Sequence, residues 1–180
     1  MLTAVFLVSA ATLAFEVLLA RVFAATQWNH LSFLVISLAL FGFGASGTFF
    51  SIRKPEAESW HSAHWALLVI LFSASLLAVV LGWNRIPLDY HRLILESVQI
   101  AYLMADYLLL ALPFFFSGTL TAAAYTAEPR RSHRIYFTSM SGSAAGGLIP
   151  LILLPAASES TLIVVAALAP LAAAGILLAS

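Results

Sequence analysis

Residues 2–25 read LTAVFLVSAATLAFEVLLARVFAA, an almost unbroken apolar run that contains one carboxylate, Glu16, and one guanidinium, Arg21. About 20 such residues, at about 1.5 Å each, cross the roughly 30 Å of bilayer hydrocarbon as a helix. The Leu, Val and Phe side chains favour insertion by about 4 to 7 kcal/mol, and an acid and a base at mid-depth oppose it by about 3 kcal/mol each. We therefore expect Arg21 to reach the near surface and Glu16 to face protein or water.

The composition extends this expectation to the whole chain. Of the 180 residues, 62% are hydrophobic and only 9% are charged, whereas soluble domains carry about 25% charged residues. Eight basic residues balance eight acidic ones, which excludes a basic nucleic-acid surface, and the absence of cysteine excludes disulfides and thiolate metal sites. An integral membrane protein is predicted, with the lipid bilayer as its surroundings.

Further apolar runs follow the first, and all are too long for the strands of a membrane barrel. The sequence predicts an all-α bundle of six transmembrane helices in a single domain, 1–180. The six spans are 2–25, 31–52, 64–83, 99–126, 135–155 and 161–180.

The basic residues of the short connections predict the orientation. Arg53 and Lys54 lie in the second connection and Arg130, Arg131 and Arg134 in the fourth, whereas the third holds only Arg85 and Arg92. Basic loops stay in the cytoplasm, so both termini are expected to be cytoplasmic. The alternative, a signal peptide cleaved near residues 22–24, is disfavoured because no basic segment precedes the first apolar run.

Ionisable residues within or beside the spans predict a polar pocket. Ser9, Thr12 and Glu16 share a helix face, and Arg21 lies on another, so each of the two charges needs a partner from a different helix. A polar stripe of Asp89, Arg92, Glu96, Gln99 and Asp106 leads inward along the fourth span. We expect a pocket open to the non-cytoplasmic face that binds a small cationic ligand or relays protons; the alternative is that its members only pair to fix helix register. Its predicted residues are Glu16, Arg21, His30, Arg92, Glu96 and Asp106.

Other polar and small residues have simpler interpretations. The five histidines lie at span ends as interfacial anchors, and only His30 and His91 share a side for a bis-histidine haem, so no cofactor or metal is expected. No hydrolase or nucleotide-binding motif is present, and no catalytic residue is expected in this chain. Small residues predict close helix packing at two places. These sets are Ser37, Gly44, Gly47 and Ser51 in the second span, and Ser139, Gly142, Ser143, Gly146 and Gly147 in the fifth.

Several stretches resemble the membrane-bound spermidine synthase-like proteins, also described as fused transporter/spermidine synthases. Residues 15–23 (FEVLLARVF) and 28–47 (WNHLSFLVISLALFGFGASG) resemble the start of that family. Residues 112–118 (LPFFFSG), the basic 130–134 and 135–146 (IYFTSMSGSAAG) resemble its fourth and fifth helices. The resemblance covers nearly the whole chain, and Glu16, Arg21 and His30 match the family's recurrent membrane motif.

The resemblance implies a membrane module of the bacterial inner membrane that anchors a cytoplasmic Rossmann-like domain or subunit for aminopropyl or methyl transfer. The chain itself contains no glycine-rich strand–helix unit for such chemistry, so no enzyme residue is transferred to it. Two other interpretations stay open. One is a small transporter or half-transporter, although no inverted repeat is visible. The other is a structural subunit of a respiratory or photosynthetic membrane complex, with cofactor-bearing partners.

Overall fold

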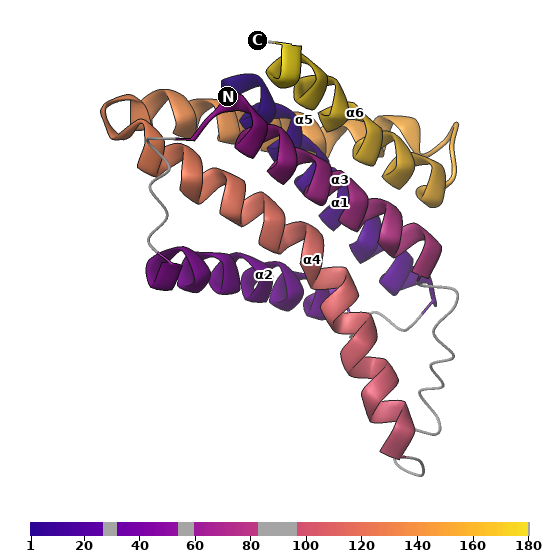
Figure 1. Ribbon diagram of the computed structural model, residues 1–180. Helices are drawn as coiled ribbons and strands as arrows, with labels where there is room; N and C mark the ends of the chain where they lie inside the picture. Colours follow the sequence, from indigo (N-terminus) through magenta and orange to yellow (C-terminus); the bar gives the residue numbers. More distant parts are fainter. Residues whose placement is uncertain (27–31, 54–59, 83–96, 180) are drawn as a thin grey trace.

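A computed structural model describes residues 1–26, 32–53, 60–82 and 97–179 (Figure 1). These residues form six α-helices and one short 3-10 turn, without a strand, and all six α-helices are long and apolar enough to cross a membrane. The predicted all-helical fold is thereby confirmed; the largest difference is at the start of the fifth helix, at residue 132 instead of 135. The elements are α1 (Leu2–Thr26), α2 (Ser32–Arg53), α3 (Ser62–Gly82), α4 (Ser97–Ala127), the 3-10 turn η5 (Pro129–Arg131), α5 (Ser132–Leu153) and α6 (Glu159–Ala179).

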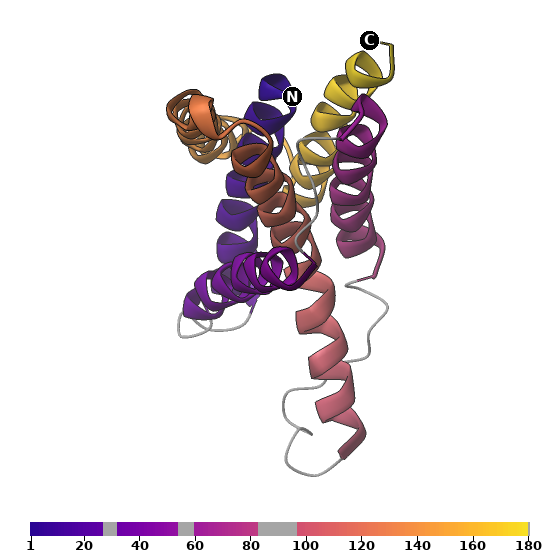
Figure 2. The same cartoon turned by 60° about the vertical axis from the view of Figure 1, so that its left-hand side comes forward.

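Helix α1 is the centre of the bundle, because it contacts each of the other five α-helices. The closest pairs are α1 with α5, α3 with α6, and α2 with α4. Figures 1 and 2 show α2 crossing α4 at a steep angle, and they show the first part of α4 extending beyond the other helices. With 31 residues, α4 is about 46 Å long, more than the roughly 30 Å hydrocarbon layer needs.

Large apolar side chains hold the centre together. Phe15 of α1 and Phe114 of α4 are fully buried, with ring centroids 5.5 Å apart. The ring of Phe43 from α2 lies 6.2 Å from the same Phe114. One aromatic side chain of α4 therefore joins three helices, at a tilted geometry that aromatic pairs favour.

The small residues of α5 allow a close approach to α1. A Cβ atom at Gly142 would meet the backbone of Phe6, and one at Gly146 would lie 2.7 Å from the Ala10 carbonyl carbon. These two glycines are four residues apart, as are their two contacts on α1, so the backbones meet along a stripe of the small-xxx-small kind. The predicted close packing of the fifth helix is confirmed.

The predicted packing face of α2 is wrong. A Cβ atom at Gly44 or Gly47 would meet nothing within 4 Å, whereas one at Gly42 would lie 2.5 Å from the Phe114 Cβ of α4 and 2.9 Å from the Ala111 carbonyl oxygen. Ser46, one turn after Gly42, is buried against Gly118. The second span carries small residues on two faces, and its steep crossing of α4 selects the face of Gly42 and Ser46.

Candidate functional site

A polar pocket of about 360 Å³ lies between α1, α4 and α5, with Phe43 of α2 at its side. Each of the three helices contributes polar side chains at spacings of three or four residues, so each presents one polar face to the pocket. These are Ser9, Thr12 and Glu16 from α1, Ser117, Thr121 and Tyr125 from α4, and Tyr136, Ser139 and Ser143 from α5.

Hydrogen bonds between hydroxyl groups connect the three helices around this pocket. Ser9 Oγ of α1 lies 3.0 Å from Ser139 Oγ of α5, in a buried contact. Thr12 Oγ1 lies 2.7 Å from the Val8 carbonyl oxygen and 2.8 Å from Ser117 Oγ of α4. The Thr12 hydroxyl is the donor in both contacts, so its one proton is shared between the Val8 carbonyl oxygen of its own helix and Ser117 Oγ of α4. The hydroxyl groups are thus oriented around the pocket by the helices themselves.

Glu16 is the one acidic or basic residue among the described residues that line this pocket. It follows Thr12 by one helical turn, on the face that also carries Ser9, as the sequence predicted. Its carboxylate therefore shares the pocket with hydroxyl and phenol groups and with no basic side chain from the described parts of the chain. Such an acid in an otherwise apolar bundle is well suited to bind a cation or exchange a proton.

The pocket extends from Glu16 toward the end of the bundle that carries η5. Tyr125 lies in the last turns of α4 and Tyr136 in the first turns of α5, and these two helices are joined through η5. The connection itself is basic, with Arg130 and Arg131, and Arg131 Nη1 binds Glu128 Oε2 at 3.3 Å. A ligand in the pocket would have Glu16 at one end and two phenols near the basic turn at the other.

Arg21 lies away from the Glu16 pocket. Its Nε atom donates to Glu159 Oε1 at 3.1 Å, which joins the end of α1 to the beginning of α6. The side chain of Arg21 is 58% exposed, in agreement with the expectation that it reaches a surface. The prediction that its partner comes from another helix is confirmed, although the partner, Glu159, was not among the predicted site residues.

Asp106 lies in a different region from Glu16. Helices α1 and α4 are antiparallel, with Thr12 level with Ser117 and Phe15 level with Phe114. This register places Asp106 of α4 beside residue 23 of α1, which is about 10 Å along the helix axis from Glu16. Asp106 is 4% exposed, and its Oδ1 atom has no hydrogen-bond partner within the described residues. The pocket lined by Glu16 does not include it. The predicted residues His30, Arg92 and Glu96 lie outside the described residues, so a common role for the six stays a prediction.

Histidines and aromatic rings gather at the beginning of α3. The imidazole of His64 stacks on Trp60 with centroids 5.7 Å apart, and His61 lies 6.3 Å from His64. Indole and imidazole rings at a span end are typical of a membrane–water interface. Across the described ranges, no group of three His, Cys, Asp or Glu side chains is placed to hold a metal ion.

Sequence reasoning did not assign most of the pocket hydroxyls to the site. On α4, Ser117, Thr121 and Tyr125 recur every fourth residue, which is a visible helical stripe. On α5, Tyr136, Ser139 and Ser143 were interpreted as packing residues or left unassigned. Reading the stripes of α1, α4 and α5 together would have pointed to a shared polar pocket.

Comparisons with protein-family models, with curated proteins and with solved structures find no match to this chain.

Proposed function

We propose that the chain is a multi-pass membrane module whose pocket between α1, α4 and α5 binds a small organic cation, with Glu16 as its counter-ion. The observation that carries the proposal is the position of Glu16, alone in charge among the described lining residues and surrounded by hydroxyl groups. A carboxylate without a basic partner among the described residues is costly in a membrane bundle, and a bound cation offsets that cost.

The chemistry of the lining favours an amine as this cation. An ammonium group has only donors, and the carboxylate of Glu16 and the oxygens of Ser143, Thr121 and the two tyrosines are acceptors. The phenol rings of Tyr125 and Tyr136 add faces that attract cations. A small amine fits this combination better than an anion, because no basic side chain is found among the described lining residues.

Orientation by basic residues places the open end of the pocket on the cytoplasmic side. Arg130 and Arg131 precede α5, Arg134 lies in its first turn, and Arg53 ends α2. By the positive-inside rule both connections are cytoplasmic, and with them both termini. The amine then enters near Tyr125 and Tyr136 and reaches Glu16 at greater depth. This proposal replaces the expected opening on the non-cytoplasmic face.

The resemblance to spermidine synthase-like proteins supports a further proposal, that this module serves a cytoplasmic Rossmann-like transferase at the bacterial inner membrane. An amine pocket that opens to the cytoplasm suits that arrangement. The test is to purify the protein from its native membrane and assay aminopropyl transfer from decarboxylated S-adenosylmethionine to putrescine. Activity that co-purifies supports the proposal, and co-purification with cofactor-bearing electron-transfer subunits, without transferase activity, contradicts it.

Amine binding is tested with Glu16→Gln, which keeps the size of the side chain and removes its charge. Hydrogen bonds to a charged group contribute about 1.5 to 3 kcal/mol, so we expect putrescine and spermidine to bind at least about tenfold more weakly. The measurement is calorimetric titration of the protein in lipid nanodiscs.

The matched control is Glu128→Gln, which removes an exposed carboxylate from the same basic turn but outside the pocket lining. This variant should bind both amines as the unmodified protein does. Equal weakening in the two variants would indicate general surface electrostatics, and unchanged binding in Glu16→Gln would contradict the proposal. Amine uptake into liposomes that depends on Glu16 would instead favour a transporter.

A further inference from the structure

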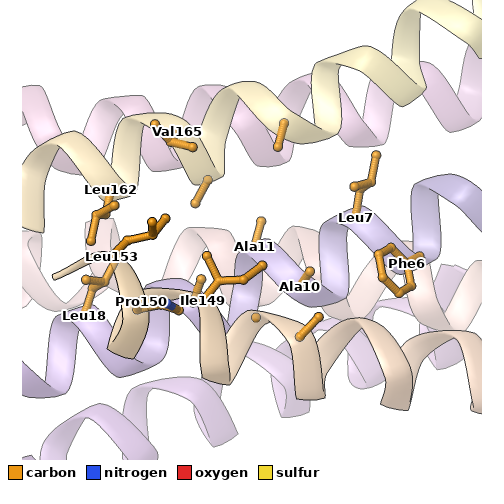
Figure 3. A pocket seen from close by; sticks show the side chains of 15 residues that line it. Phe6, Leu7, Ala10, Ala11, Leu18, Ile149, Pro150, Leu153, Leu162 and Val165 are labelled. Atoms are coloured by element: carbon orange, nitrogen blue, oxygen red, sulfur yellow. The ribbon is translucent and has the colours of Figure 1, made fainter. Parts of the chain in front are cut away.

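A second cavity, of about 160 Å³, lies between α5 and α6 over one side of α1 (Figure 3). Ala10 and Ala11 of α1 form part of its wall, Ile149 lies on α5, and Leu162 and Val165 lie on α6. Among the described residues that line it there is no polar side chain. An apolar cavity of this kind holds no ordered water and accepts only an apolar group.

The cavity exists because α5 and α6 follow each other in the chain but hardly contact each other. Helix α5 packs on α1, and α6 packs on α3 and α1. Ile149 is 47% exposed and Val165 is 52% exposed, so the space between the two helices opens sideways at the surface of the bundle. In a bilayer, such a lateral opening faces acyl chains.

The dimensions fit one hydrocarbon chain. Along α1 the lining runs from Phe6 to Leu18, about 18 Å at 1.5 Å per residue, which is close to one leaflet of a roughly 30 Å hydrocarbon layer. The enclosed volume is similar to that of an engineered cavity that holds one benzene molecule, so it takes up only a part of the chain, and the remainder lies in the lateral opening. A helix with its side chains is about 10 Å wide, so a slender chain fits here and a helix of a partner or of a second copy does not.

One end of the cavity is polar. Arg21 follows Ala14 by seven residues on the cavity face of α1, and Glu159 precedes Leu162 by three on α6. Their ion pair therefore lies just beyond the last lining residues, where the guanidinium of Arg21 is more than half exposed. Next to it Ser158 Oγ, 2.8 Å from Thr161 Oγ1, accepts from the Thr161 backbone N–H. A guanidinium beside hydroxyl groups and a helix start favours a phosphate.

We propose that this cavity is a binding site for one phospholipid, with an acyl chain between α5 and α6 and the phosphate at Arg21. The site is separate from the amine pocket and does not depend on it. The bound chain fills space that α5 and α6 leave open, and the phosphate shares Arg21 with Glu159.

The test uses delipidated protein in detergent, titrated with phosphatidylglycerol and followed by native mass spectrometry. Ala145→Leu and Ala169→Leu place a larger side chain in the cavity from α5 and from α6, and each should weaken phosphatidylglycerol retention at least tenfold. The matched controls Ala144→Leu and Ala172→Leu add the same volume on exposed residues next to the lining and should retain lipid normally. Thermal denaturation in the same detergent verifies that all four variants are folded.

The position of the phosphate is tested with Arg21→Gln and with two probes, phosphatidylglycerol and a fatty alcohol that lacks phosphate. Arg21→Gln should weaken the phospholipid at least fivefold and leave the alcohol unchanged. The proposal is overturned if folded cavity variants retain lipid as their controls do, if Arg21→Gln affects neither probe, or if cross-linking through Ile149 reveals a second copy seated over the opening.

Discussion

The two sides of α1 present opposite chemistry to the rest of the bundle. One side carries Thr12 and Glu16 into a pocket of hydroxyl groups, and the other carries Leu7, Ala14 and Leu18 into a cavity without a polar lining residue in the described parts of the chain. Because a helix turns by about 100° per residue, such adjacent positions point to different neighbours. The comparison teaches that overall hydrophobicity, which is similar along all of α1, does not determine what a given face can bind.

Helix α5 separates these two regions. Ser139 and Ser143 line the polar pocket, and Ile149 lines the apolar cavity. Between the pocket and the cavity, the glycines of α5 lie directly against the backbone of α1. Substitutions in α5 therefore disturb the wall that both regions share, and substitutions such as Thr12→Val disturb the polar side alone.

Gly146→Ala should have the largest effect on stability. The added Cβ atom would meet the backbone of Ala10, which cannot move aside as a flexible side chain does. Overpacking of this kind destabilises proteins by about 1 to 3 kcal/mol, and we expect a value near 3 kcal/mol because backbone meets backbone. The measurement is the free energy of unfolding in mixed micelles of lipid and SDS.

Gly44→Ala is the matched control, because a Cβ atom there meets nothing within 4 Å. Alanine is a better helix former than glycine, so this variant should gain about 0.5 to 1 kcal/mol. Opposite signs for the two variants would support the separating role of α5. Equal effects on the free energy of unfolding would show that α1 and α5 can move apart at little cost, and would contradict a separating role for α5.

Thr12→Val should have a smaller effect, confined to the polar side. It removes the hydroxyl that donates to Ser117 Oγ of α4 and to the Val8 carbonyl oxygen, and we expect a loss of about 1 kcal/mol in unfolding free energy. Thr48→Val is the control, since its hydroxyl, at an exposed position, donates within α2 to the Gly44 carbonyl at 3.0 Å. A loss in Thr48→Val as large as that in Thr12→Val would mean that the bond between α1 and α4 contributes nothing of its own.

Much of the helical fold could be predicted from the sequence, because one physical requirement determines it. A run of about 20 apolar residues satisfies its backbone only as a helix in lipid, and this fixed each span to within a few residues. The packing face of α2 could not be predicted, because small residues occupy two of its faces. Gly42 was missed because the choice between those faces depends on how α4 crosses.

The site was less predictable than the helices, because it too depends on how the helices pack against one another. The shared face of Ser9, Thr12 and Glu16 follows from spacing within one helix, and the structure brings these residues together. The contact of Arg21 with Glu159, and the distance of Asp106 from Glu16, depend on which helices are neighbours and on their register. A single sequence contains no direct signal for either.

The ion pair between Arg21 and Glu159 also has a consequence for biosynthesis. Its two members are 138 residues apart in the chain, and ribosomes add about 5 to 20 residues per second. The charged first helix is thus made roughly 7 to 30 s before its counter-ion on the last one. During that interval the exposed guanidinium of Arg21 is free to interact with water, and the link between the end of α1 and the beginning of α6 forms only after α6 has been added.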